Sequence, residues 1–357
     1  MGWALAIDKT DISKASLIET ESAPLEDGQA RLAVRRFAMT ANNITYAAFG
    51  EIMRYWDFFP ASDGGRLPVW GFAEVTESKA DGLQIGERIY GYLPAGDELI
   101  VEPARINAGA FIDTAPHRAD LPAAYNRYTR CQGDPGYRED REAVQMVLQP
   151  LFLTSWLIDL HLREEGFFGA QQISLTSASS KTALALAWLL HRNRPEGVAI
   201  EAMTSKRSMG FVAETGYYDA ITLYDALAEL KAEPKRLIVD FAGDAQITTD
   251  IHTALGDALA ADIRVGAAHW EHAAPPKGLP GPKPVFFFAP DHVARRISEW
   301  GPAQFAKRYA ADWTAFADEG GALFEEQDLA GADGALDAYT RLVTNTAPAK
   351  AALTVRV

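Results

Sequence analysis

The stretch between residues 171 and 207 constrains the fold of this chain more than any other. An apolar run over 173–175 ends in small and hydroxylated residues, a helical pattern follows over 182–192, and a second apolar run covers 198–203. Strand, turn, helix and strand form a βαβ unit. In such a unit the turn faces the phosphates of a dinucleotide, because the helix N-terminus supplies N–H groups and the positive end of its dipole.

The turn of this unit is unusual because it contains no glycine. Dinucleotide-binding turns normally follow the pattern G-x-G-x-x-G. Serine and alanine still let a backbone come close to a phosphate, and hydroxyl groups can donate hydrogen bonds to its oxygens. The turn is therefore a candidate cofactor site, and an ordinary crossover without a ligand is the alternative. The candidate residues are Thr176, Ser177, Ala178, Ser179, Ser180, Lys181 and Thr182.

The residues after the second strand indicate which dinucleotide would bind. NAD-binding proteins usually place Asp or Glu there to bind the ribose 2′-hydroxyl, whereas this chain has Ser205, Lys206 and Arg207. Lysine and arginine attract a 2′-phosphate that a carboxylate would repel. In a chain with a formal net charge of −14, a local Lys-Arg pair is informative. We therefore predict NADP(H) as the cofactor, with a solvated helix start as the alternative.

Two further strand ends are candidates for the nicotinamide side, since parallel strands bring their C-terminal ends to the ligand crevice. The strand over 236–241 ends in Phe241, Ala242 and Gly243, which would allow close approach of a ribose. The next strand leads to His269, which could donate to a carbonyl oxygen. The alternatives are a plain strand-to-turn exit and a histidine whose hydrogen bonds are satisfied within the protein.

The regions on either side of the βαβ unit predict an α/β protein with more than one domain. Short strands with Gly and Pro between them are typical of a partly open, GroES-like β-barrel. Strands that alternate with helices indicate a Rossmann domain with a doubly wound parallel sheet. The expected divisions are 1–142 for the barrel, 143–290 for the Rossmann domain and 291–357 for a C-terminal segment that returns to the barrel.

Several details of this division are specific enough to be checked. A polar, Tyr-rich stretch over 112–142 is expected to be a lid or pocket wall. We expect a helix over 225–232, a strand over 285–289 and one helix over 292–319.

Composition excludes several classes of function. The net charge of −14 argues against a nucleic-acid partner, because phosphate contacts need clustered Lys and Arg. Cys131 is the only cysteine, so Cys-rich zinc sites are excluded and no metal is expected; it is a bystander or a reactive thiol. No signal pattern and no apolar run of membrane-spanning length occur, which predicts a cytoplasmic protein without a membrane partner.

The stretch Leu83-Gln-Ile-Gly-Glu-Arg-Ile-Tyr-Gly is similar to the (F/L)-x-x-Gly-Asp-Arg-Val-x-Gly motif of the medium-chain dehydrogenase/reductase superfamily. Residues 34–46, with Asn43 at the Asn position, 71–77 and 325–355 resemble further motifs of that superfamily. The single cysteine departs from its zinc-dependent branch, so the chain resembles the zinc-free quinone/enoyl reductases. Asn-Asn-Ile-Thr-Tyr and Tyr-Trp-Asp-Phe-Phe-Pro resemble a divergent bacterial family of unknown function within it.

The resemblance implies an NADPH-dependent oxidoreductase that reduces an activated C=C or C=O in a small hydrophobic substrate, and a homodimer. Such a reduction needs a hydride, a donor to the developing oxyanion and a proton. Asn43, Tyr46 and Tyr55 fall where reductases of this branch approach nicotinamide and substrate, and a Tyr hydroxyl can serve as donor. The alternatives are an aromatic barrel core for these tyrosines, and a non-catalytic dinucleotide-binding or scaffold protein for the whole chain.

Overall fold

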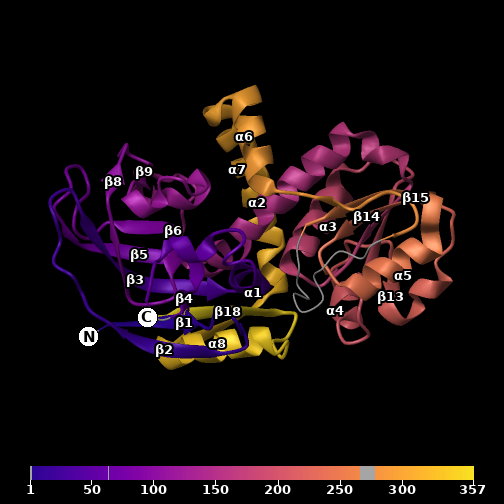
Figure 1. Ribbon diagram of the computed structural model, residues 1–357. Coiled ribbons are helices and arrows are strands. Elements are labelled where there is room, and N and C mark those ends of the chain that lie inside the picture. The colour runs from indigo at the N-terminus through magenta and orange to yellow at the C-terminus, as the bar shows by residue number, and fades with distance from the viewer. Residues whose placement is uncertain (1, 63, 266–277) are drawn as a thin grey trace. The chain divides into compact units, whose positions relative to one another are not determined.

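The computed structural model describes residues 2–62, 64–265 and 278–357, and the chain divides into two compact units (Figure 1). The first unit comprises Met1–Val147 and Phe324–Val357, and the second comprises Leu148–Leu323. Each unit has its own sheet and its own buried core. The fold is the two-part α/β architecture expected from the sequence, with a largely antiparallel barrel-like unit and a parallel Rossmann unit.

The first unit is built on a mixed sheet in the order β17-β18-β3-β5-β6-β10-β9-β8, with β7 also paired to β3. A small sheet in the order β2-β1-β4 belongs to the same unit. Helices α1 (Ala41–Ala48) and α8 (Gly331–Val343) complete it. The strands are β1 (Gly2–Ile7), β2 (Ala15–Thr20), β3 (Ala30–Met39), β4 (Gly65–Arg66), β5 (Pro68–Ser78), β6 (Arg88–Pro94), β7 (Glu98–Val101), β8 (Pro103–Ala104), β9 (Ala110–Asp113), β10 (Arg127–Arg130), β17 (Glu325–Ala330) and β18 (Ala351–Arg356).

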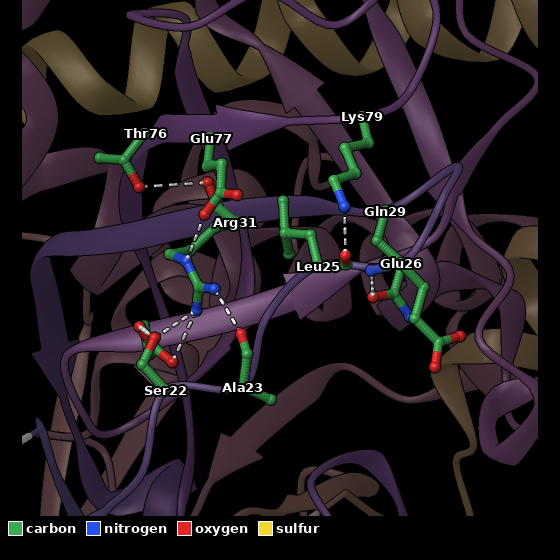
Figure 2. Close-up of polar contacts among 10 residues, drawn as sticks. Ser22, Ala23, Leu25, Glu26, Gln29, Arg31, Thr76, Glu77 and Lys79 are labelled. Carbon is green, nitrogen blue, oxygen red and sulfur yellow. Dashed lines mark hydrogen bonds and ion pairs between the residues drawn. The ribbon is translucent and has the colours of Figure 1, made fainter.

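Polar contacts fix the segment between β2 and β3 to the neighbouring strands, as Figure 2 shows. Arg31 on β3 donates through Nη1 to Ser22 Oγ at 2.6 Å and through Nη2 to the Ala23 carbonyl at 2.5 Å. Lys79, just after β5, donates to the Leu25 carbonyl at 2.6 Å. Because both cations reach backbone carbonyls, the chain enters β3 in a defined register.

The second unit contains the parallel sheet β13-β12-β11-β14-β15-β16, in which each neighbouring pair is parallel. Strands β12 and β13 are added in turn on one side of β11, and strands β14, β15 and β16 are added in turn on its other side. The order of the strands therefore reverses between β11 and β14. This is the Rossmann order, and ligands of such sheets bind at the reversal. The strands are β11 (Gln172–Leu175), β12 (Ala199–Thr204), β13 (Ala220–Leu223), β14 (Arg236–Asp240), β15 (Leu259–Arg264) and β16 (Val285–Phe286).

The helices of the second unit include one long helix, α2 (Glu142–Glu164), which begins in the first unit. In the described part of the chain, its extended form Glu139–Glu164 is long and apolar enough to cross a membrane, but 56% of its apolar window is buried inside the protein. Core helices of soluble proteins have the same property. The other helices are α3 (Lys181–Asn193), α4 (Met209–Glu214), α5 (Ala245–Leu255), α6 (Ala289–Trp300) and α7 (Pro302–Glu319).

The units divide at different residues from those expected, since helices α6 and α7 belong to the second unit and only the chain from Phe324 onward belongs to the first. The reason is aromatic packing on α2. Trp156 lies edge-on to Phe305 at 5.4 Å between ring centroids and donates its indole N–H to Asp312 at 2.8 Å. The expected boundary at 290/291 was therefore wrong for residues 291–323.

Three local expectations were also wrong. The single helix over 292–319 is interrupted at Gly301, which has a φ of 77°, and at Pro302, which cannot donate a helical hydrogen bond. The helix over 225–232 is a short 3-10 helix, Tyr224–Glu229. The strand over 285–289 is limited to Val285–Phe286, because α6 begins at Ala289.

The Tyr-rich stretch over 112–142 is not a lid along its whole length. Its strand β10 pairs with both β6 and β9 in the barrel sheet. Tyr128 on β10 is buried and donates its hydroxyl to the Tyr92 carbonyl at 2.6 Å. This part of the stretch is integral to the core of the first unit.

Candidate functional site

The glycine-free turn lies at the C-terminal end of β11, beside the reversal of strand order. Ser177 adopts a left-handed backbone conformation with a φ of 45°, which is uncommon outside glycine. The amide of Ala178 donates to the Met203 carbonyl of β12 at 3.2 Å. Ser180 then caps helix α3, accepting from the Ala183 amide at 3.3 Å. The chain therefore passes from strand β11 into helix α3 through a tight turn that contains no glycine.

Small residues occupy the three positions that glycine takes in such loops. With the G-x-G-x-x-G spacing ending inside α3, those positions fall on Ala178, Ser180 and Ala183. Ala178 and Ala183 are completely buried. A helix packs closely on its strand only when the last of these positions is small, and the buried Ala183 meets that requirement.

The turn contains N–H groups that could donate hydrogen bonds to a phosphate. Among the described contacts, the amides of Ser179 and Thr182 donate to no protein acceptor, as expected at the first turn of a helix. Lys181 lies half-buried between them, and burial lowers the pKa of its ammonium group to about 8. A bound phosphate would raise the pKa of this lysine again, because an adjacent anion favours the ammonium.

Two tyrosines that the sequence did not single out hold the turn in place. Tyr224, just after β13, accepts the Ser177 amide through its hydroxyl at 2.7 Å. Tyr218 donates its hydroxyl to the Ala178 carbonyl at 2.8 Å. The signal for them was weak, because both are separated from the turn by about 40 residues or more along the chain. These two hydrogen bonds hold the turn around the left-handed Ser177. A glycine would adopt that backbone conformation without such support.

A buried hydrogen-bond network joins the two strands at the reversal. Thr176, after β11, donates to Asp240 Oδ1 of β14 at 2.6 Å and accepts the amides of Phe241 and Ala242 at 2.9 and 3.0 Å. Asp240 Oδ1 also accepts the Gly243 amide at 3.1 Å. The pKa of Asp240 is raised, mainly by burial. The candidate residues Phe241, Ala242 and Gly243 therefore form a turn whose amides point into the protein.

The other candidate cofactor residues are placed as follows. Ser205, Lys206 and Arg207 follow β12 directly and are exposed, at the edge where a Rossmann sheet receives the ribose of the adenosine. His269 lies outside the described residues.

Asn43, on α1, has a structural role in the first unit. Its Oδ1 accepts the Thr40 amide at 2.7 Å, which forms a capping box at the start of the helix. Its Nδ2 donates to the Pro68 carbonyl at 2.8 Å. Because both ends of the amide are bonded to backbone, Asn43 positions α1 against β5.

Tyr46 and Tyr55 lie together in an aromatic cluster, with ring centroids 4.7 Å apart. The hydroxyl of Tyr46 accepts the Trp70 indole N–H at 3.2 Å. Burial raises the pKa of both tyrosines above the ordinary value. Both phenols are therefore protonated at neutral pH and can act as donors.

The remaining sequence candidates concern cysteine and metals. Cys131 is buried, and burial raises the pKa of its thiol to about 12, so it is not a reactive thiolate at neutral pH. Within residues 2–62, 64–265 and 278–357, no group of three or more His, Cys, Asp and Glu side chains has metal-binding geometry.

The barrel-like unit, the Rossmann strand order and the strand-turn-helix loop together make a two-unit α/β architecture. The chain belongs to the family described as Protein of unknown function (DUF2855), whose model matches residues 37–348. No curated protein matches the sequence.

Solved structures of low sequence identity share the fold over the whole chain. CurA from Vibrio vulnificus in complex with NADPH has a TM-score of 0.64 at 12% identity, covering 100% of this chain and 99% of that chain. Mycobacterial Rv1454c complexed with NADPH has a TM-score of 0.60 at 11% identity, with 100% of both chains covered. The yhdH oxidoreductase from Salmonella enterica in complex with NADP has a TM-score of 0.57 at 14% identity, also with 100% of both chains covered.

Proposed function

We propose that the protein is a zinc-independent, NADP(H)-dependent reductase of an activated C=C or C=O in a small hydrophobic substrate. The observation that carries the proposal is the turn after β11 at the reversal of strand order, in which the Ser179 and Thr182 amides, on either side of Lys181, have no protein acceptor among the described contacts. Structures with the same fold are described as complexes with NADPH or NADP. Cytoplasmic location and the absence of nucleic-acid and membrane partners are part of the proposal.

The cofactor would be held by its phosphates. Ser179, Lys181 and Thr182 would bind the pyrophosphate at the N-terminus of α3, where the helix dipole favours an anion. Ser205, Lys206 and Arg207 would bind the 2′-phosphate, with arginine able to make a bidentate contact. The turn of Phe241, Ala242 and Gly243, together with His269, would border the nicotinamide.

When bound, NADPH supplies a hydride to the substrate carbon. The protein must then stabilise the charge that develops on the substrate oxygen and deliver a proton. Tyr46 and Tyr55 are the candidate donors because both are protonated and lie in one apolar cluster. Asn43 would act indirectly, by fixing the helix that carries Tyr46.

The test is a titration with NADPH in which binding is measured by quenching of the fluorescence of the eight tryptophans. Assays of NADPH oxidation with quinones and with enoyl thioesters then measure turnover. Binding with turnover supports the proposal. Binding without turnover favours the second candidate, a non-catalytic dinucleotide-binding or scaffold protein. The glycine-free turn, in which Tyr224 already holds the Ser177 amide, is the observation that favours this candidate.

The preference for NADPH is expected to depend on Lys206 and Arg207. Changing both to alanine should weaken NADPH binding by about a hundredfold or more, since two charge-assisted hydrogen bonds are lost and each contributes about 1.5–3 kcal/mol. NADH binding should change little, because NADH has no 2′-phosphate. The measurement is the dissociation constant of each nucleotide, with Lys231→Ala as an exposed-lysine control in the same unit. Equal affinities for both nucleotides in the unmodified protein would contradict the assignment.

The homodimer is proposed to form at β16, the edge strand of the parallel sheet. Val285 and Phe286 are 65% and 60% exposed there, and an exposed apolar edge strand is a template for pairing with another chain. Phe286→Asp is expected to weaken the dimer by about thirtyfold, as the loss of a central interface residue does. Light scattering coupled to size exclusion measures this, with Ile85→Asp as an exposed apolar control in the other unit. A protein that is monomeric at micromolar concentration would refute the proposal.

A further inference from the structure

The first unit contains a group of four tyrosines that we call the tyrosine cluster: Tyr46, Tyr55, Tyr92 and Tyr125. They come from α1, the 3-10 helix Tyr55–Phe58, strand β6 and the 3-10 helix Ala123–Asn126. Their ring centroids lie 4.7 Å apart for Tyr46 and Tyr55, 5.4 Å for Tyr46 and Tyr92, and 4.6 Å for Tyr92 and Tyr125. Segments that are distant in the sequence therefore bring four phenol groups to one place.

The hydroxyls of the cluster are neutral donors. Burial raises the pKa of all four tyrosines, and their mutual proximity adds to this for Tyr46, Tyr92 and Tyr125. The Trp70 indole N–H joins them, donating to the Tyr46 hydroxyl at 3.2 Å. The apolar side chains of Phe58, Phe59 and Leu121 pack in the same buried cluster as the tyrosine rings.

One of these hydroxyls is left without a partner. Within the described residues, the Tyr92 hydroxyl makes no hydrogen bond, although the side chain is completely buried. A buried hydroxyl without a partner destabilises the fold by about 1–3 kcal/mol, and native proteins rarely retain one without a use for it. Trp70 and Tyr125 are half-buried, so the cluster extends to the surface at these two side chains.

The charges around the cluster indicate what kind of ligand would fit. The nearest buried cation is Arg118, whose guanidinium lies 4.9 Å from the centre of the Phe59 ring. It is already ion-paired with Asp113 at 3.2 Å, and its charge lowers the pKa of Tyr92 against the larger effect of burial. A site with neutral donors and aromatic walls stabilises a delocalised oxyanion. It does not recover the hydration that a carboxylate or a phosphate would lose.

We propose that the tyrosine cluster binds the oxygen of a conjugated oxyanion, a phenolate or an enolate, with Tyr92 and Tyr125 as hydrogen-bond donors in addition to Tyr46 and Tyr55. The enolate case rests on the proposed reductase function, because an enolate forms when hydride adds to a conjugated carbonyl compound. Phenolate binding does not require turnover or a cofactor. It can therefore be tested separately.

The test uses a nitrophenol that is ionised at the pH of the assay, titrated into the full chain while the phenolate absorption band is followed, with and without NADPH. Nitrobenzene, which has the same ring and no oxyanion, is the matched neutral ligand. Tyr92→Phe and Tyr125→Phe are each expected to weaken phenolate binding by about tenfold, since a hydrogen bond to a charged group is lost. Nitrobenzene binding should be unchanged in both variants.

Tyr339→Phe is the control, because Tyr339 is a buried tyrosine of the same unit whose hydroxyl donates to the Ile12 carbonyl. It should leave phenolate affinity unchanged. The proposal is overturned if the phenolate does not bind, if it binds no more tightly than nitrobenzene, or if the cluster variants weaken both ligands equally. A protein that binds the phenolate but not NADPH would refute the reductase function and leave this site standing.

Discussion

Replacing Thr176 with valine is expected to lower the free energy of unfolding by about 2–4 kcal/mol and to weaken NADPH binding by about tenfold. Valine has the shape of threonine without the hydroxyl. The Thr176 hydroxyl donates to Asp240 and accepts the Phe241 and Ala242 amides, and all of these groups are buried. The Phe241 amide would lose its partner, while Ala242 would keep Asp240 Oδ1 at 3.0 Å.

The expected loss of NADPH affinity follows from the position of Thr176 in the chain. Thr176 is the last residue before the left-handed Ser177, so its hydroxyl fixes where the turn leaves β11 relative to the turn after β14. Chemical denaturation and NADPH titration measure the two losses, and Thr176→Ser is the matched control because it keeps the hydroxyl. If the valine variant were as stable as the original chain, the network would not hold the reversal together. If it were destabilised with unchanged NADPH affinity, the turn would not be the phosphate site.

The sequence predicted the Rossmann sheet well because its central strands β11, β12 and β14 are largely buried. The run over 236–241 is almost continuously apolar, and β14 is completely buried. Such runs identify parallel strands without tertiary information. The expectation of a strand-to-helix turn after residue 175 needs only the chain order of strand, helix and strand, and the structure has this turn between β11 and α3.

Elements at the edges of the two units were missed because they are exposed and their sequences are polar or show no break in pattern. Strand β17 has the polar sequence Glu-Glu-Gln-Asp-Leu-Ala and is largely exposed, so no hydrophobic period marks it. Its place is fixed by pairing with β18, which is a tertiary interaction. Likewise α6 and α7 were read as one helix, because the helical pattern continues on both sides of Gly301 and Pro302.

The candidate site was predictable only where its residues are neighbours in the sequence. Asn43 and Tyr46 share one helix, but the contact by which Asn43 positions that helix is made with the carbonyl of Pro68, 25 residues away in the sequence. Tyr92 and Tyr125 were not considered because their meeting with Tyr46 depends on the register of β6 and on a 3-10 helix near residue 125. Long-range convergence of this kind leaves no local pattern.

His252 on α5 is expected to make the stability of the protein depend on pH. Its Nδ1 lies 2.8 Å from the Pro280 carbonyl oxygen and its Nε2 lies 2.9 Å from Asp262 Oδ2. Both partners can only accept when Asp262 is ionised, so both ring nitrogens donate only if the imidazole is protonated. Burial opposes protonation, but the hydrogen bonds to Asp262 and Pro280 outweigh it and raise the pKa of His252. The charge of Asp240 acts in the same direction.

The raised pKa gives the stability of the protein a defined dependence on pH. A group whose pKa is higher in the folded than in the unfolded state contributes its full stabilisation below the unfolded value, which is about 6.5 for histidine. This contribution is lost as the pH rises through the folded pKa. His252→Ala removes the partner of a buried carboxylate and is expected to lower the free energy of unfolding by about 3–5 kcal/mol near pH 6.

The difference between the original chain and His252→Ala should therefore be largest near pH 6 and become smaller toward about pH 9, as the neutral imidazole gives up one of its two hydrogen bonds. Urea denaturation at a series of pH values measures it. His191→Ala is the control, because His191 is exposed on α3 and should show a small difference at every pH. A difference that stays constant or grows with pH would mean that the pKa of His252 is not raised in the folded protein, which would contradict the prediction.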